Sequence, residues 1–132
     1  MDGTWKVLVI SDRPITMKVI KSALKDCTVF FESTWRGDQA DFCDLVNQCV
    51  IEQQIDLIII ETLATDPGTK SCVTNAGKIR LVCPEFPSII CLLSSQTLQH
   101  SLELSKVKGL RAVYKPFNTA DIHAAVKGAI LQ

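Results

Sequence analysis

The chain has 132 residues, and its 14 basic and 14 acidic side chains give a formal net charge of zero. This length suffices for a core that needs no disulfide or metal, so we expect residues 1–132 to form a single domain. The hydrophobic content of 47% excludes a disordered or low-complexity chain. A neutral chain also lacks the concentrated basic surface that phosphate backbones require, so we expect no nucleic-acid partner.

The longest apolar runs are Leu57–Ile60 and Ile89–Leu93. Both are far shorter than the roughly 20 residues that a membrane-spanning helix needs, and the segment Met1–Trp5 shows no signal-peptide pattern. We therefore expect a cytoplasmic protein without a membrane partner.

Six cysteines are spread along the chain without a C-x-x-C motif or a Cys/His cluster, a distribution that disfavours a zinc site. Two of them, Cys27 and Cys91, fall in expected strands. We expect the cysteines to serve as small buried hydrophobic residues. A redox role for Cys72 and Cys83, at the edges of a less regular segment, is the alternative.

The first half of the chain alternates short apolar runs with segments of helical periodicity. Lys6–Ile10 predicts a strand, and Asp12 is expected to cap the following helix, whose first turn suits Pro14. A second helix, opened by Gly37-Asp38, carries an apolar stripe with i, i+3, i+4, i+7, i+8 spacing. The other expected strands of this half are Thr28–Phe31 and Ile55–Ile60.

The second half continues the alternation after residues 62–71, which are rich in Thr, Asp, Pro, Gly and Ser and predict a loop. A weak helix is expected over Val73–Val82, where Gly77 interrupts the pattern. A modest helix over Thr97–Lys106 ends at Gly109, and Asn118 caps the last helix. The expected strands of this half are Ser88–Leu93 and Leu110–Tyr114.

Strands that alternate with helices predict an α/β fold, a (βα)₅ three-layer sandwich with a parallel sheet covered on both faces. In such folds functional groups gather beyond the carboxyl ends of the strands. A lysine there can pair with a carboxylate or a phosphoryl group, and carboxylates can hold a hard cation such as Mg²⁺. The residues at those ends are Ser11-Asp12, Glu61, Ser94-Ser95 and Lys115-Pro116.

These strand ends carry a resemblance to a known family. Lys6–Pro14 resembles the first strand of response-regulator receiver domains with its acidic pair. Ile55–Glu61 resembles the strand that ends in their phospho-acceptor aspartate, and Ala112–Phe117 resembles their fifth strand with its lysine and proline. The resemblance covers nearly the whole chain. It implies a CheY-like, flavodoxin-like sheet of order 2-1-3-4-5 and a cis peptide bond before Pro116.

Two positions of the acceptor site depart from the family pattern. Glu61 stands at the phospho-acceptor position, and Ser11 replaces the first carboxylate of the acidic pair, leaving Asp12. The extra methylene of glutamate moves its carboxylate by about 1.5 Å, and a displacement of that size can lower a rate about 10²-fold. We therefore expect a degenerate phosphorylation site, with Glu61 as a standing negative charge. With one carboxylate missing, we expect Mg²⁺ to bind weakly, in the millimolar range at best.

The switch positions are atypical as well. Ser94 matches the family's switch hydroxyl if one residue is deleted before Lys115, and Leu93 matches it otherwise. The aromatic switch position, three residues before the lysine, holds Ala112. The resemblance thus assigns Lys115 as the family-type lysine. Ala112 lacks the aromatic ring that would respond to a change at Ser94.

The resemblance implies a signalling domain of a two-component phosphorelay that acts through protein contacts and is not an enzyme. Its partner would be a histidine kinase or an output protein. That partner would bind the face formed by Thr97–Lys106, Leu110–Tyr114 and the last helix, which includes Tyr114, Lys106 and Lys108. The alternative is a conventional receiver that is phosphorylated, with Asp66 as a substitute acceptor.

Two other modules share this architecture. A flavin-binding module needs a hydroxyl- and glycine-rich phosphate loop after the first strand, whereas Ser11–Thr16 has no glycine and includes an aspartate. A corrinoid-binding domain needs its D-x-H-x-x-G signature after the first strand. The similar Asp121–His123 lies on the last helix, with Val126 in place of the glycine, and we expect His123 to be exposed.

Overall fold

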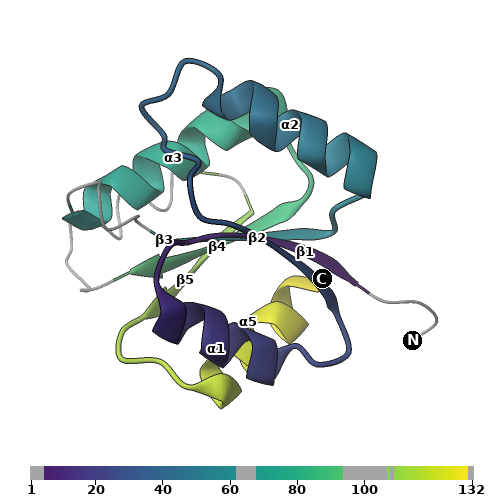
Figure 1. Ribbon diagram of the computed structural model, residues 1–132, viewed down its shortest axis with the longest axis vertical. Coiled ribbons are helices and arrows are strands. Elements are labelled where there is room, and N and C mark those ends of the chain that lie inside the picture. Colours follow the sequence, from purple (N-terminus) through teal and green to yellow (C-terminus); the bar gives the residue numbers. More distant parts are fainter. Residues whose placement is uncertain (1–4, 62–67, 94–106, 108, 131–132) are drawn as a thin grey trace.

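The structure, a computed structural model, describes residues 5–61, 68–93, 107 and 109–130 (Figure 1). The strands are β1 (Lys6–Ile10), β2 (Thr28–Glu32), β3 (Leu57–Glu61), β4 (Ser88–Leu93) and β5 (Leu110–Tyr114). The described helices are α1 (Pro14–Ala23), α2 (Phe42–Gln53), α3 (Gly68–Val82) and α5 (Thr119–Ile130). The helix expected over Thr97–Lys106 lies outside the described residues and stays a prediction.

The five strands form one parallel sheet in the order β2-β1-β3-β4-β5. This confirms the predicted α/β class and the strand order 2-1-3-4-5. Helices α2 and α3 cover one face of the sheet, and α1 and α5 cover the other, so the molecule has three layers (Figure 1). Because all strands are parallel, their carboxyl ends lie along the same edge of the sheet.

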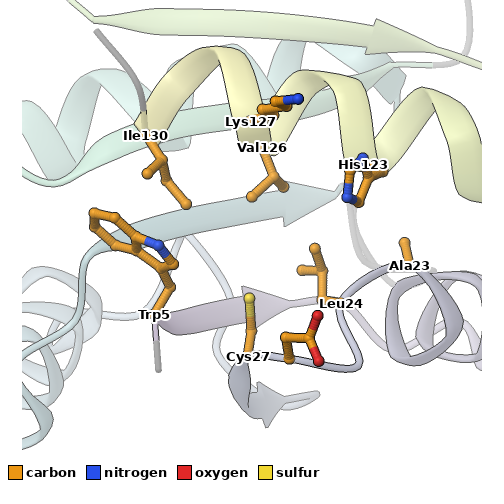
Figure 2. A pocket seen from close by; sticks show the side chains of 9 residues that line it. Trp5, Ala23, Leu24, Cys27, His123, Val126, Lys127 and Ile130 are labelled. Carbon is orange, nitrogen blue, oxygen red and sulfur yellow. The ribbon is translucent and has the colours of Figure 1, made fainter. Parts of the chain in front are cut away.

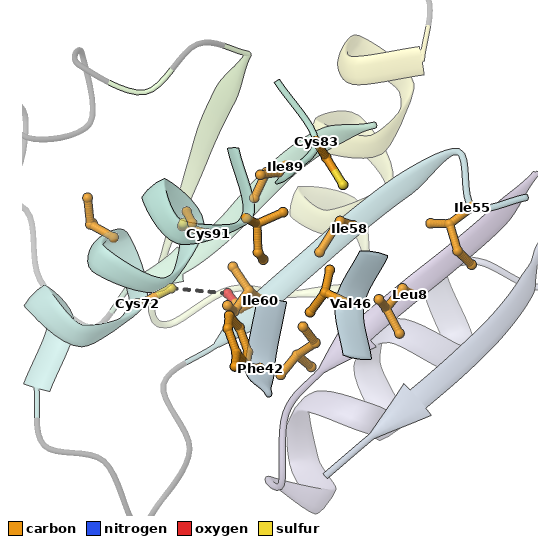
Figure 3. Close-up of a cluster of buried hydrophobic side chains, with 14 of the residues drawn as sticks. Leu8, Phe42, Val46, Ile55, Ile58, Ile60, Cys72, Cys83, Ile89 and Cys91 are labelled. Atoms are coloured by element: carbon orange, nitrogen blue, oxygen red, sulfur yellow. Dashed lines mark hydrogen bonds between the residues drawn. The ribbon is translucent and has the colours of Figure 1, made fainter. Parts of the chain in front are cut away.

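The central strands divide their side chains between two cores, because successive residues of a strand point to opposite faces. In β1, Val7 packs with α1 and α5, whereas Leu8 packs with α2 and α3. Strand β3 is buried along its whole length, which is typical of a parallel strand covered by helices. Figure 3 shows the core beneath α2 and α3, where the Cys72 thiol donates a hydrogen bond to the Ile60 carbonyl at 3.3 Å.

Helix α2 begins at Phe42, so the predicted start at Gly37-Asp38 is wrong. The segment before α2 packs on α3 instead. The Lys78 ammonium donates a hydrogen bond to the Gly37 carbonyl at 2.6 Å. Gly37 also lies so close to the Asn75 amide that an added Cβ would stand 1.7 Å from its Oδ1. This contact with α3 holds the segment outside the helix.

Helix α3 begins at Gly68, so the loop predicted for residues 62–71 is wrong over residues 68–71. Polar composition favoured a loop, but burial of Cys72, Val73 and Ala76 against the sheet stabilises the helix. At 15 residues it is the longest described helix. None of the helices in the described part of the chain is long and apolar enough to cross a membrane.

The caps of α1 and α5 have different outcomes. Asp12 does not cap α1: Arg13 occupies the N-cap position, and its own side chain makes no capping hydrogen bond. Pro14 stands in the first turn, as predicted. In α5 the predicted cap is confirmed. Asn118 Oδ1 accepts from the Asp121 N–H and Asp121 Oδ2 accepts from the Asn118 N–H, both at 2.9 Å.

Strand β3 begins at Leu57 rather than at the predicted Ile55. The preceding residue pairs with the start of β1. The Lys6 N–H donates to Asp56 Oδ2 at 2.8 Å, and the Asp56 N–H donates to the Lys6 carbonyl at 2.7 Å. These two bonds satisfy polar groups at the amino edge of the sheet.

All six cysteines are free thiols. Three of them, Cys72, Cys83 and Cys91, are buried, which agrees with the expected hydrophobic role, and the other three are half-buried. Cys27 precedes β2 instead of lying within it. The alternative redox role of Cys72 and Cys83 is not tested by this geometry.

Candidate functional site

Ser11, Glu61 and Lys115 meet at the carboxyl edge of the sheet. Ser11 directly follows β1, Glu61 is the last residue of β3, and Lys115 directly follows β5. Backbone hydrogen bonds hold two of these positions. The Ser11 N–H donates to the Glu32 carbonyl at 3.1 Å, and the Lys115 N–H donates to the Leu93 carbonyl at 2.8 Å. The sheet pattern thus continues one residue past β1 and β5 and fixes where both side chains start.

The Glu61 carboxylate is the centre of this site, with a side chain that is only 1% exposed. The Ser11 hydroxyl, itself fully buried, donates a hydrogen bond to Glu61 Oε1 at 2.7 Å. The same hydroxyl oxygen accepts the Arg13 N–H at 3.2 Å. One serine therefore both satisfies a buried carboxylate oxygen and ties it to the backbone that starts α1.

The second oxygen of Glu61, Oε2, faces two cations. The Lys115 ammonium forms an ion pair with it, and Arg13 Nε lies 3.8 Å away. The contact with Lys115 is an ion pair without hydrogen-bond geometry, because Oε2 has no hydrogen-bond donor among the described residues. Burying a lone carboxylate is expensive, so these two cations offset the loss of water around Glu61.

A shallow groove of about 620 Å³ opens beside this ion pair. Its polar end carries Asp12, Arg13 and Lys115, so the half-buried Asp12 lines the same groove as the lysine of the Glu61 pair. The peptide bond between Lys115 and Pro116 is cis, which turns the chain from β5 toward α5. The remaining lining residues are Pro14, Ile15, Val19, Pro116 and Phe117.

No family model and no curated protein match the sequence, but solved structures match the fold. A response regulator from Thermotoga maritima aligns with a TM-score of 0.74 and 19% identity over 98% of this chain and 100% of its own. A two-component response regulator from Clostridium difficile aligns with a TM-score of 0.73 and 20% identity over 98% of each chain. The chain has the fold of a receiver domain. The signal receiver domain of an HD domain-containing protein from Pseudomonas fluorescens also has this receiver fold, with a TM-score of 0.71 and 16% identity over 98% and 96% of the two chains.

Within the receiver fold, the structure brings together only some of the residues that the sequence singled out. Ser11, Glu61 and Lys115 are in contact, and Asp12 lies in the adjoining groove. Ser94 and the loop residue Asp66 lie outside the described residues, so their roles stay predictions.

The alternative switch position, Leu93, is buried in the core beneath α2 and α3. Ala112, at the aromatic switch position, is half-buried and packs against the same core. Neither side chain carries a polar group that could contact the Glu61 carboxylate.

Sequence reasoning missed Arg13. A signal was available, because a cation three residues past a strand end stands at the same sheet edge as the strand-end carboxylates. The structure places its guanidinium beside Glu61.

The divalent cation that the receiver resemblance implies does not fit these residues. Mg²⁺ demands octahedral oxygen ligands. Among the described residues no group of three or more His, Cys, Asp or Glu side chains could hold a metal ion. Glu61 Oε1 already accepts the Ser11 hydroxyl, and Oε2 faces the positive groups of Lys115 and Arg13. A metal at Glu61 would compete with both contacts.

A second cavity, of about 340 Å³, lies between the end of α1 and α5, with Trp5 at its rim (Figure 2). Trp5 precedes β1, so this cavity stands at the amino edge of the sheet, opposite Glu61. His123 lines it from α5 and is exposed, as predicted. None of the carboxyl-edge site residues contributes to this cavity.

Proposed function

We propose that the chain is a receiver-like signalling domain in which Glu61 takes the place of the phospho-acceptor aspartate. The observation that carries this proposal is the buried contact of Glu61 with both Ser11 and Lys115 at the end of β3. The sequence resemblance assigns the acceptor to this strand end. Two features of the structure support the proposal. Ser11 and Lys115 hold the Glu61 carboxylate in one orientation, and the carboxylate is buried and does not point into solvent.

A glutamate in this setting is a poor phosphoryl acceptor. Phosphoryl transfer depends on positioning and on neutralising charge around an in-line geometry. Glu61 Oε1 accepts a hydrogen bond from Ser11, and Oε2 is paired with Lys115, so both oxygens are engaged. Attack on a phosphoryl donor would require one of these contacts to break.

The proposed role of Glu61 is to supply a permanent negative charge where a conventional receiver acquires one by phosphorylation. A phosphoryl group carries a charge of about −1.5 to −2, whereas a carboxylate carries about −1. Glu61 therefore supplies only part of the charge of a phosphoryl group, but it supplies that charge permanently. The domain would act through contacts with a protein partner, either a histidine kinase or an output protein, and would catalyse no reaction of its own.

The proposed partner face is formed by β5, α5 and the helix expected over Thr97–Lys106. Of this face the structure describes β5 with Tyr114, and α5. Lys106 and Lys108 lie outside the described residues. This role would place the domain in the cytoplasm, with no membrane or nucleic acid as its partner.

The test is exposure of the protein to acetyl phosphate with Mg²⁺, followed by intact-mass spectrometry. We expect the unmodified protein to gain no phosphoryl group and to bind no beryllofluoride. Glu61→Asp should be labelled slowly and partially, because the shorter side chain reopens space near Lys115. Adding Ser11→Asp should increase that labelling. Glu52→Asp, the same chemical change on the exposed side of α2, is the control and should stay unlabelled.

A conventional receiver is the competing function. Phosphorylation of the unmodified protein, mapped by peptide sequencing to Glu61 or to Asp66, would overturn the proposal and restore that reading. Failure of the Ser11→Asp and Glu61→Asp double variant to be labelled while folded would also count against it, because the site would then not be a converted acceptor.

A further inference from the structure

We propose that the guanidinium of Arg13 is the built-in counter-cation of this crevice and takes over the charge that a divalent metal would supply. The inference rests on the proposed function, since it treats the Glu61 edge as a converted receiver site. The residues of that site do not fit Mg²⁺, and the guanidinium of Arg13 supplies positive charge beside Glu61 in place of the metal.

The charges at this site balance without a metal ion. The pattern implied by the resemblance has three carboxylates and one lysine, a net charge equal and opposite to that of one divalent cation. Here Ser11 removes one negative charge and Arg13 adds one positive charge. Among the described residues of this edge, Asp12 and Glu61 are matched by Arg13 and Lys115, so these four side chains carry no net charge that would attract a divalent cation.

The backbone of Arg13 is fixed by two hydrogen bonds. Its N–H donates to the Ser11 hydroxyl at 3.2 Å, and its carbonyl accepts the Met17 N–H at 3.1 Å in the first turn of α1. The backbone is therefore held on both sides of the residue. From this anchored position the side chain places Nε 3.8 Å from Glu61 Oε2.

Arg13 carries a planar, cationic guanidinium, a group well suited to pairing with a carboxylate. The side chain is 44% exposed while the carboxylate that it faces is 1% exposed, so the cation caps Glu61 from the solvent side. A metal ion approaching from solvent would have to displace it.

The experiment uses Mn²⁺ as the probe, because its binding is read directly from water-proton relaxation without any phosphoryl chemistry. Four proteins are compared: the unmodified chain, Ser11→Asp, Arg13→Gln and the double variant. We expect no saturable binding below the millimolar range for the unmodified chain and only weak binding for Ser11→Asp. The double variant should bind about tenfold more tightly than Ser11→Asp, because a carboxylate is gained and the competing cation is lost.

The control is Arg36→Gln in the Ser11→Asp background. Arg36 is also 44% exposed and also pairs with a carboxylate, that of Asp38, but it lies away from the crevice. This variant should bind Mn²⁺ no better than Ser11→Asp. Equal affinity of the Arg13→Gln double variant and Ser11→Asp, or tight binding by the unmodified chain, would overturn the inference.

If the double variant fails to fold by circular dichroism, Arg13→Gln alone decides. Mg²⁺ should then raise its melting temperature, while the unmodified chain shows no rise at matched ionic strength. An unchanged melting temperature for folded Arg13→Gln would reject the inference. Metal binding and melting temperature are measured independently of labelling by acetyl phosphate. The inference about Arg13 can therefore be rejected while the proposed function stands, and the proposed function can be rejected while the inference about Arg13 stands.

Discussion

Glu61 and Lys115 form an ion pair between the ends of two strands that do not pair with each other. β4 lies between β3 and β5, and the contact passes over its carboxyl end. The pair therefore connects the centre of the sheet with its outer strand through side chains alone. A change at either residue should be transmitted to β5, which belongs to the proposed partner face.

The hydrogen bond from Ser11 to Glu61 should be a measurable part of the folding free energy. Ser11→Ala leaves a buried carboxylate oxygen without its donor, and we expect a loss of about 1–3 kcal/mol in the free energy of unfolding. Urea unfolding measures it. Thr28→Ala, at an exposed position of β2, is the control and should change stability by less than about 0.5 kcal/mol. Equal small losses for both variants would show that the bond contributes little.

Two glycines should respond in opposite directions to alanine. At Gly37 the new Cβ would overlap the amide of Asn75, which is 7% exposed, so Gly37→Ala should destabilise by about 1–3 kcal/mol. At Gly77, within α3, no described atom outside the neighbouring helix backbone lies within 4 Å of the added Cβ, so Gly77→Ala should stabilise by about 0.5–1 kcal/mol.

A double variant tests the cause at Gly37. In an Asn75→Ala background the overlap is gone, so Gly37→Ala should then cost little further stability in thermal unfolding. A full loss in that background would place the strain elsewhere than at Asn75.

The reciprocal hydrogen bonds between Asn118 and Asp121 should stabilise the start of α5. Asn118→Ala removes the acceptor for one helix N–H and should lower the free energy of unfolding by about 1 kcal/mol. His123→Ala, on the same helix and exposed, serves as the comparison and should have a much smaller effect. Guanidinium unfolding followed by far-UV circular dichroism distinguishes them, and equal effects would contradict the capping role.

Stability should fall at alkaline pH because of four buried or half-buried thiols. Burial raises the pKa of the Cys27, Cys49 and Cys83 thiols, and a hydrogen bond with Cys72, together with burial, raises the pKa of Cys91. Above about pH 8.5, thiols of the unfolded chain lose protons that the folded chain still holds. The unfolded state is then favoured, and the free energy of unfolding should decrease with rising pH.

Urea midpoints measured between neutral pH and pH 10 check this decline. Cys91→Ala should be less stable at neutral pH but should show a shallower alkaline decline, because one raised pKa has been removed. A stability that is flat or rising over this range would contradict the assignment.

The strands were predictable because each is a short, mainly apolar run that local sequence identifies without its surroundings. Lys6–Ile10, Ser88–Leu93 and Leu110–Tyr114 agree with the structure to the residue. The contact between Glu61 and Lys115 was predictable for the same reason, since parallel strands end at one edge.

The errors occurred where long-range packing overrides local pattern. The start of α2 was misplaced because Gly37 is held by Lys78 and Asn75 of α3, residues far away in sequence. The early start of α3 was missed because burial of Cys72 outweighs a polar composition. Arg13 was missed because its importance depends on the direction of a long side chain, which spacing does not reveal.

The carboxylate held between Ser11 and Lys115 also bears on how long a signal lasts. An acyl phosphate is hydrolysed and must be renewed, whereas the carboxyl group of Glu61 is part of the chain itself and needs no renewal. Under the proposed function, the negative charge at this site cannot be removed by dephosphorylation. The strength of the signal therefore depends on the number of copies of the chain that are present. The response of the partner protein should then follow the rates of synthesis and proteolysis of this chain. Removing a kinase should leave that response unchanged, whereas varying the expression level of the chain should change it.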